Sequence, residues 1–190
     1  MLRLFVAVDL PTAEQQAVAG LCTSVQGARW AKPHQLHITL RFMGQTPDDQ
    51  LPLIRQRLAA VKASPFRLAL SGVGVFPAAR KPRVLWLGLQ PAEPLIFLKR
   101  EIDAALGPTS PADPDEEKRD FHPHLTLARF TRPPGESLAR FLAQHDTHRG
   151  VEWEVDCFRL YRSTLHPSGA VHEPVAAYPL TWICRDQGIP

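Results

Sequence analysis

Two stretches of the chain repeat the same polar pair inside apolar surroundings. LHITLRF at 36–42 and HPHLTLARF at 122–130 each place a threonine two residues after a histidine. The two histidines, His37 and His124, are 87 positions apart (124 − 37 = 87). An imidazole with a pKa near ~6.5 can accept or give a proton close to neutral pH. Two such groups, each with a hydroxyl beside it, are suited to general acid–base chemistry.

In a β-strand, successive side chains point to opposite faces of the sheet. His37 therefore shares a face with Thr39, and His124 shares a face with Thr126. If a pseudo-twofold axis relates the two halves, these polar faces can meet. One imidazole could then take a proton from water while the other protonates a departing ribose oxygen, and the hydroxyls could donate to the other phosphate oxygens. This is the set of groups that phosphodiester hydrolysis without a metal requires.

Two other interpretations of the pairs are open. A single His-x-Thr in a strand is more often structural than functional, because threonine is a good strand former and histidine is often half-buried. A metal site is the other, since His122 and His124 could supply ligands. No carboxylate or cysteine accompanies them at ligand spacing, so we expect no metal and no cofactor.

The elements around the two pairs also repeat. Each His-x-Thr segment ends at a breaker and is followed by a helix, the first with an apolar stripe of Leu51, Ile54, Leu58 and Val61 and the second at 136–145. Further strands are predicted at 3–9, 66–77, 82–89, 153–163 and 175–183, with a turn at 166–169, and further helices at 12–25 and along Leu95, Leu98, Ile102 and Leu106. The repeat predicts an internal duplication and a mostly antiparallel sheet. We assign the aromatic residues Phe5, Trp30 and Trp86 to the core rather than to base stacking.

Composition limits the class of protein. The chain has 190 residues, a net charge of +3 and a pI near 9.0, a mild basic bias that suits a phosphate-bearing ligand. No apolar window reaches the length of a membrane span. The cysteines, Cys22, Cys157 and Cys184, are odd in number and lack a CxxC motif. We therefore expect reduced thiols in a cytoplasmic protein.

These segments together resemble a known family. The chain is similar to the two-histidine phosphoesterase superfamily, and specifically to the bacterial and archaeal RNA 2′,3′-cyclic phosphodiesterases, long called 2′-5′ RNA ligases. The similarity runs almost end to end through RLFVAVDLP, LHITLRFMG, VGVFPAARKPRVLWLGL, FHPHLTLARF and LYRSTLHPSGAV. It implies an α+β fold with a bilobal pseudo-twofold duplication, in which two antiparallel sheets line a V-shaped cleft and the helices lie outside. Residues 1–190 would form a single bilobal domain.

The resemblance also implies an activity. The chain would hydrolyse a terminal 2′,3′-cyclic phosphate of RNA to a 2′-phosphate, with His37 as proton donor to the 3′ oxygen and His124 as proton acceptor from water. Its partners would be RNA ends, and it would be a monomer. The same site could run in reverse and join RNA ends through a 2′-5′ linkage. The alternative is a non-catalytic RNA- or nucleotide-binding module. The two motifs are nearly symmetric, so the sequence does not assign acid and base.

Two arginines are candidates for the cation that the pairs lack. Alternation places Arg41 on the His37 face, which makes it a candidate for phosphate contact. Arg129 closes the family's second motif and by resemblance contacts the substrate. Alternation places it on the opposite face, with Leu125 and Leu127, so it can reach the substrate only if the strand ends or bulges there.

Overall fold

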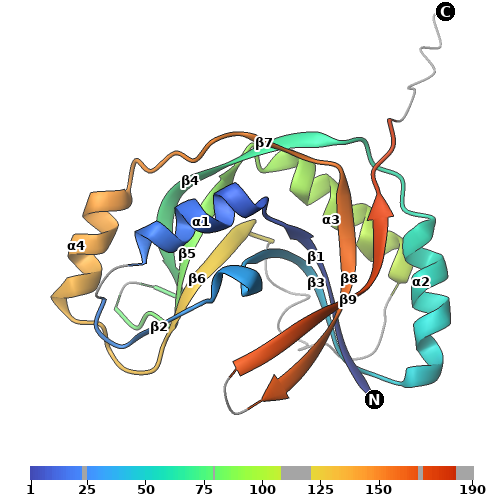
Figure 1. Cartoon of the computed structure of the whole chain (residues 1–190), viewed down its shortest axis with the longest axis horizontal. Coiled ribbons are helices and arrows are strands. Elements are labelled where there is room, and N and C mark those ends of the chain that lie inside the picture. Colours follow the sequence, from blue (N-terminus) through green and yellow to red (C-terminus); the bar gives the residue numbers. More distant parts are fainter. Residues whose placement is uncertain (23–24, 79, 108–120, 167–168, 183–190) are drawn as a thin grey trace, which may run out of the picture.

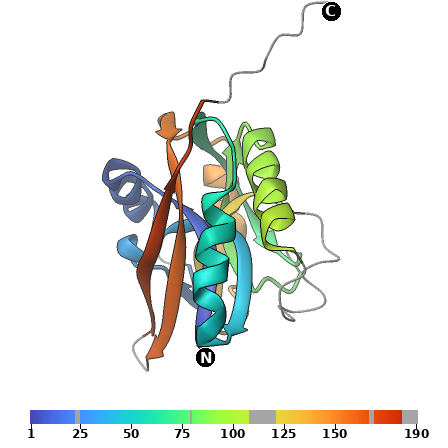
Figure 2. The same ribbon diagram turned by 90° about the vertical axis from the view of Figure 1, so that its right-hand side faces the viewer.

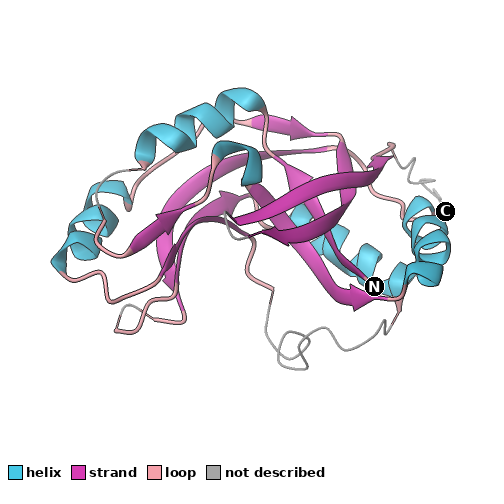
Figure 3. Cartoon of the chain, turned by 60° about the horizontal axis from the view of Figure 1, so that its bottom comes forward, coloured by secondary structure: helices cyan, strands magenta, loops and turns pink. Residues whose placement is uncertain are grey.

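The computed structural model describes residues 1–22, 25–78, 80–107, 121–166 and 169–182, which form an α+β fold of helices and antiparallel sheets (Figures 1 and 3). In chain order the elements are β1 (Leu2–Asp9), α1 (Thr12–Leu21), β2 (Ala28–Trp30), the 3₁₀ turn η1 (Pro33–Gln35), β3 (His37–Thr46), the 3₁₀ turn η2 (Asp48–Gln50), α2 (Leu51–Ala59), β4 (Phe66–Phe76), β5 (Val84–Gln90), α3 (Glu93–Leu106), β6 (His124–Phe130), α4 (Glu136–His145), β7 (Trp153–Val155), β8 (Cys157–His166) and β9 (Gly169–Pro179).

The strands form two sheets. We use the word lobe for a sheet together with the helices that pack on it. The first lobe has the strand order β3-β1-β8-β9 and the second has β2-β6-β5-β4-β7. Every pairing within them is antiparallel. The two strands that carry the His-x-Thr pairs, β3 and β6, lie next to each other. The sheets therefore meet at the two motifs, as the predicted duplication requires.

In each lobe, one helix that follows a strand of its sheet in the chain packs against the other sheet. The helices α2 and α3 lie side by side on the first lobe (Figure 2), although α3 follows β5 of the second. Conversely, α1 follows β1 of the first sheet but lies over the second sheet (Figure 1). There Glu14 of α1 lies beside Gly150, whose N–H donates to the Leu70 carbonyl of β4. The helices thus tie the two sheets to a shared core.

The predicted apolar stripes lie in the core. Leu95, Leu98, Ile102 and Leu106 of α3 are fully buried, and Ile54 and Leu58 of α2 are buried as well. In β1, alternate residues Leu4, Val6 and Val8 belong to the same core cluster as the leucines of β5 and β6. The 3.6-residue period of the sequence therefore correctly predicts the buried faces of these helices, whereas β1 is buried on both faces from Leu4 to Val8.

The tail differs from the prediction of one strand over 153–163. The chain forms two strands there, β7 in the second sheet and β8 in the first, with a break at Asp156. The Asp156 carbonyl accepts a hydrogen bond from the N–H of Leu180 at 2.7 Å instead of joining a ladder. β9 also starts at Gly169, earlier than predicted, and the short strand β2 was not predicted.

Candidate active site

The two motif histidines are held in the same way. The Nδ1–H of His37 donates to the Gln35 carbonyl at 2.7 Å, and that of His124 donates to the His122 carbonyl, also at 2.7 Å. A carbonyl can only accept, so Nδ1 carries the proton in each ring. Nε2 of each neutral imidazole therefore keeps its lone pair. Both rings can take up a proton at Nε2 and, once charged, can donate it there.

The support of His37 extends to the far edge of its sheet. Gln35 ends the η1 turn, and its Nε2 donates to the Ala170 carbonyl of β9 at 2.6 Å. The Lys32 N–H donates to the Gln35 Oε1 at 3.2 Å. The residue whose carbonyl orients His37 is therefore fixed from two sides.

Both motif strands carry a β-bulge at the same position. In β3, Thr39 pairs with Ala7 and Arg41 pairs with Val6, so Leu40 is an extra residue. In β6 the extra residue is Leu127, three positions after its histidine just as Leu40 is. A bulge shifts the alternation of side chains by one residue.

This shift reverses the prediction for the arginines. Arg129 follows the Leu127 bulge and is exposed, and it shares a face with Thr126, so the condition stated for its approach to the substrate is met. The predicted placement of Arg41 on the His37 face is wrong. Its Nη1 donates to Asp103 Oδ1 at 2.9 Å and its Nη2 to the Gly107 carbonyl at 2.9 Å, on the side of α3. The position in β3 that matches Arg129 holds Phe42.

The electrostatics keep both imidazoles neutral at neutral pH. Burial is the largest cause and lowers the pKa of His37 to about 4. Burial also lowers the pKa of His124. The positive charge of Arg129 lowers the pKa of both rings. One guanidinium thus acts on imidazoles from two different sheets, which indicates that all three groups share one site.

One carboxylate distinguishes the two histidines. Asp9 stands opposite His37 in the β1–β3 ladder, whereas Gly88 stands opposite His124 in the β5–β6 ladder. The Asp9 carboxylate accepts hydrogen bonds from the Tyr161 hydroxyl at 2.5 Å and from the Arg159 guanidinium. Its negative charge raises the pKa of His37 and so partly offsets the effect of burial. Among the described residues, the second motif has no such carboxylate, but burial and the nearby His172 act against Asp9 and leave the pKa of His37 well below its usual value.

Aromatic rings surround each histidine, and the sequence did not predict their contacts with the histidines. His37 contacts Phe5 at 4.8 Å and His172 at 5.2 Å between ring centroids. His124 contacts Phe76 at 5.0 Å, and the Trp86 ring lies 6.5 Å away. The assignment of Trp86 to the core is wrong, because cross-strand partners share a face and Trp86 pairs with Thr126. The placement of Trp86 on the face of Thr126 follows from the strand register, which the sequence does not give.

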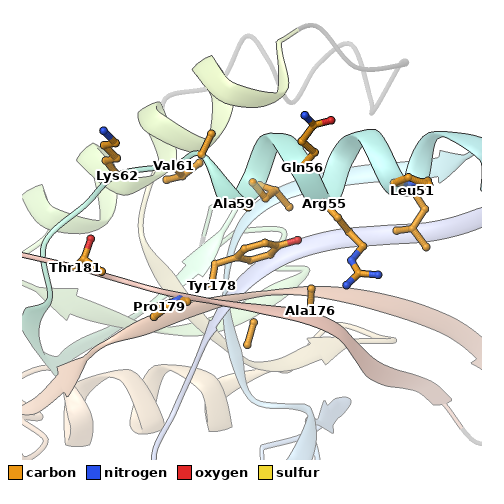
Figure 4. Close-up of a pocket in the computed structure, with 14 residues that line it drawn as sticks. Leu51, Arg55, Gln56, Ala59, Val61, Lys62, Ala176, Tyr178, Pro179 and Thr181 are labelled. Carbon is orange, nitrogen blue, oxygen red and sulfur yellow. The ribbon is translucent and has the colours of Figure 1, made fainter.

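A groove on the first sheet faces away from the histidines, and the described residues hold no cluster of metal ligands. Within the part of the chain that the structure describes, no group of three or more His, Cys, Asp or Glu side chains is placed to hold a metal ion. A groove of about 820 Å³ lies between α2 and β9, on the helix-covered face of the first sheet (Figure 4). Tyr178, which lines it, pairs with Phe158 of the core, on the face opposite to His37.

Comparison with known proteins identifies the family of the chain. A model of the 2′-5′ RNA ligase superfamily matches residues 11–167. The RNA 2′,3′-cyclic phosphodiesterase of Thermus thermophilus is 36% identical over 189 residues, covering 94% of this chain and 90% of that protein. The protein of the same name from Archaeoglobus fulgidus is 32% identical over 180 residues, covering 93% and 99%.

Solved structures have the same fold. The crystal structure of TT0787, also from Thermus thermophilus, matches with a TM-score of 0.75 and 31% identity, covering 94% of this chain and 97% of that one. E. coli LigT complexed with 3′-AMP matches with a TM-score of 0.73 and 26% identity, covering 95% and 99%. The fold and the paired His-x-Thr strands define a two-histidine phosphoesterase. Within that class, the chain belongs to the 2′-5′ RNA ligase superfamily and its group of RNA 2′,3′-cyclic phosphodiesterases.

Proposed function

We propose that this chain hydrolyses the terminal 2′,3′-cyclic phosphate of RNA to a 2′-phosphate by general acid–base catalysis that needs no metal. The observation that carries the proposal is the matched pair of imidazoles. Each has its proton on Nδ1, and both lie within the field of Arg129. The names of the relatives, RNA 2′,3′-cyclic phosphodiesterases, give the class of substrate.

The proposed reaction breaks one P–O bond and forms another. Nε2 of His124 takes a proton from water as its oxygen attacks phosphorus. The bond from phosphorus to the 3′ oxygen breaks, and His37 gives that oxygen a proton from its own Nε2. The product is a 2′-phosphate with a free 3′ hydroxyl, and a second proton exchange with solvent restores both rings. Thr39, Thr126 and Arg129 stabilise the charge that gathers on the non-bridging oxygens.

The histidine that acts as the acid must be protonated in the enzyme–substrate complex. Burial lowers its pKa and so opposes this protonation. A bound cyclic phosphate carries a negative charge, and a nearby opposite charge raises the pKa of an imidazole. The carboxylate of Asp9 acts in the same direction at His37 alone. The resemblance to the family implies the same order, so we assign the acid to His37 and the base to His124, with Asp9 as the group that supports the acid.

The test is an assay with excess chelator, a short RNA ending in a 2′,3′-cyclic phosphate, and identification of the product. We expect turnover to a 2′-phosphate product. Replacing His37 or His124 by alanine should each lower kcat at least about a hundredfold, the usual contribution of a general acid or base. His148 gives a matched control variant, His148→Ala, that should keep full activity: it follows α4, and its carbonyl accepts from the N–H of Gly72 in β4, a strand that β5 separates from β6.

Each other outcome would overturn the proposal. Loss of turnover with chelator would mean metal catalysis, and binding without turnover would mean a binding module. A 3′-phosphate product would mean that the other P–O bond breaks.

The reverse joining of RNA ends through a 2′-5′ linkage uses the same groups and belongs to the proposal as a minor reaction, because water far exceeds RNA ends in concentration.

We also infer that the protein acts in the cytoplasm as a monomer. Cys22 and Cys157 are free thiols, as in a reducing compartment, while Cys184 lies outside the described residues. No helix among the described residues is long and apolar enough to cross a membrane. The groups proposed for the reaction all come from one chain, so catalysis requires no second copy.

A further inference from the structure

Two arginines stand next to each other on the site face of the second sheet. Arg29 of β2 is the cross-strand partner of Arg129 in β6, and such partners share a face of the sheet. The next residue, Trp30, points to the other face, where it packs on Phe141 of the core, 5.7 Å away between ring centroids. Because Arg129 shares its face with Thr126, Arg29 also lies on the face of the proposed catalytic groups. It is one strand further out than Arg129, on the edge strand of the sheet.

The Arg29 side chain reaches the first lobe. Its Nη2 lies 3.3 Å from the point where a Cβ on Gly169, the first residue of β9, would stand. The Nε2 of Gln35 lies 3.7 Å from the same point, and the Gln35 carbonyl accepts from Nδ1 of His37. Arg29 therefore lies between the two lobes. One of its neighbours orients His37, and the other, Arg129, acts on both motif histidines.

This pair of arginines lacks a counter-charge from the protein. Both side chains are exposed, and neither forms an ion pair with a carboxylate in the part of the chain that the structure describes. Like charges directly opposite each other in a ladder destabilise it. By contrast, Arg159 on the site face of the first sheet is paired with Asp9. A bound anion would remove the repulsion, so the pair is suited to a ligand with two negative charges.

We propose that Arg29 binds the phosphodiester group on the 5′ side of the nucleoside that carries the cyclic phosphate. This inference rests on the proposed function and specifies its substrate, which would be an RNA strand rather than a free cyclic mononucleotide. Arg129 takes the cyclic phosphate, and Arg29 takes the phosphate that precedes it in the strand.

The spacing and the chemistry of the two side chains support this assignment. Successive phosphates of one RNA strand are separated by a single ribose, and directly opposite side chains of a ladder start from Cβ atoms about 4.5–5.5 Å apart. A guanidinium presents parallel N–H donors that match the oxygens of a phosphate. Contacts to phosphate carry no sequence information. The enzyme should therefore prefer RNA ends to mononucleotides whatever the base.

The test compares a nucleoside 2′,3′-cyclic phosphate with a dinucleotide that ends in the same cyclic nucleoside. The parent protein should show the higher kcat/KM on the dinucleotide. In Arg29→Gln the ratio of the two kcat/KM values should fall about 3- to 30-fold, the effect of losing one exposed charge-assisted contact. Arg140, exposed on α4, supplies the control Arg140→Gln, which removes the same charge and should keep the parent ratio.

A dinucleotide with an uncharged methylphosphonate linkage isolates the contact. It should lose the advantage of the natural dinucleotide in the parent, and Arg29→Gln should then cause no further loss, because a contact already removed cannot be removed twice. The slope of log kcat/KM against log salt concentration for the natural dinucleotide should also become shallower by about 0.7 in Arg29→Gln.

Three outcomes would overturn the subsite. A parent protein without preference for the dinucleotide would contradict it directly. An equal loss on both substrates in Arg29→Gln would show that Arg29 only supports Arg129 or the fold. A ratio that is kept in Arg29→Gln and lost in Arg3→Gln would place the preceding phosphate on the first lobe, where Arg3 lies on the face of Phe5 and its charge lowers the pKa of His172.

Calorimetric binding gives a readout that does not need turnover. The dinucleotide that ends in a 2′-phosphate should bind more tightly than the nucleoside 2′-phosphate, and Arg29→Gln should remove the difference. The subsite can therefore stand even if the proposed hydrolysis fails. Equal affinity of the parent for the two ligands would contradict it.

Discussion

At the scale of residues, burial and charge set the protonation of the two histidines. Reasoning from an unperturbed pKa near ~6.5 would predict a rate maximum near neutral pH. In the structure, burial lowers the pKa of His37 to about 4 and also lowers that of His124. The backbone carbonyls that accept from Nδ1 raise both pKa values but do not cancel the effect of burial. The sequence could supply the residue types but not this environment.

The shifted pKa values predict the pH dependence of kcat/KM. Above pH 6.5 both rings of the free enzyme are neutral, and the acid loses its proton further as pH rises, so kcat/KM should fall. Below the pKa of the base, the base becomes charged and kcat/KM should fall again. The maximum should therefore lie on the acidic side of about 6.5, and that of kcat should lie at higher pH, because the bound phosphate raises both pKa values. Steady-state rates across this range measure both, and a maximum of kcat/KM above neutral pH would contradict the account.

Asp9→Asn tests which histidine is the acid. Asp9 raises the pKa of His37, so its loss should lower that pKa. At a pH above both pKa values, a lower pKa of His37 reduces the fraction of His37 that is charged. This reduces the rate if His37 is the acid, but not if it is the base, because the base is already neutral. We therefore expect kcat/KM at neutral pH to fall severalfold if His37 is the acid. An unchanged kcat/KM, in a variant whose circular dichroism matches the parent, would assign the acid to His124.

At the scale of elements, the matched bulges decide which cation faces the site. Leu40 and Leu127 each add one residue after the threonine, which brings Arg129 to the site face and turns Arg41 toward Asp103. The sequence gives little sign of this. In β6, Leu127 and Ala128 are adjacent buried apolar residues, which is a weak sign of a bulge. In β3 the corresponding residues are Leu40 and the polar Arg41, so this sign is missing there. The longer strands were predictable from the sequence, but the short strand β2 and the bulges were not.

The same limit explains the break between β7 and β8. The segment 153–163 has an uninterrupted strand pattern, and nothing local marks Asp156 as the point where the chain leaves one sheet for the other. The change depends on which strands are available for pairing, β4 for β7 and β1 for β8. Such long-range competition is absent from a local pattern.

Gly88 allows strands β4 and β5 to lie close together. It stands opposite His124, and an added Cβ would lie 2.5 Å from the Ser71 carbonyl oxygen of β4. Gly88→Ala should therefore push β4 and β5 apart and lower the free energy of unfolding by about 1–3 kcal/mol. Gly20 in α1 has no atom within 4 Å of such a Cβ, so Gly20→Ala is the matched control and should raise stability by about 0.5–1 kcal/mol. Urea unfolding compares them, and equal stabilities would refute the steric argument.

At the scale of the whole molecule, exchanged helices and adjacent motif strands join the two lobes. Because α3 leaves the second sheet to cover the first and α1 does the reverse, each lobe buries part of its core under the other's helix. The chemistry also needs both lobes, since the proposed acid lies on β3 and the proposed base on β6. That residues 1–190 form one bilobal domain stays a prediction, and this exchange is the reason to expect it.

The most direct test of the central claim is a crystal structure with a nucleoside 2′-phosphate bound. We expect Nε2 of His124 within about 3.2 Å of a phosphate oxygen and Nε2 of His37 within about 3.2 Å of the 3′ hydroxyl oxygen, with the two imidazoles on opposite sides of the phosphorus. A nucleotide contacted by one imidazole alone, with the other turned elsewhere, would contradict the account.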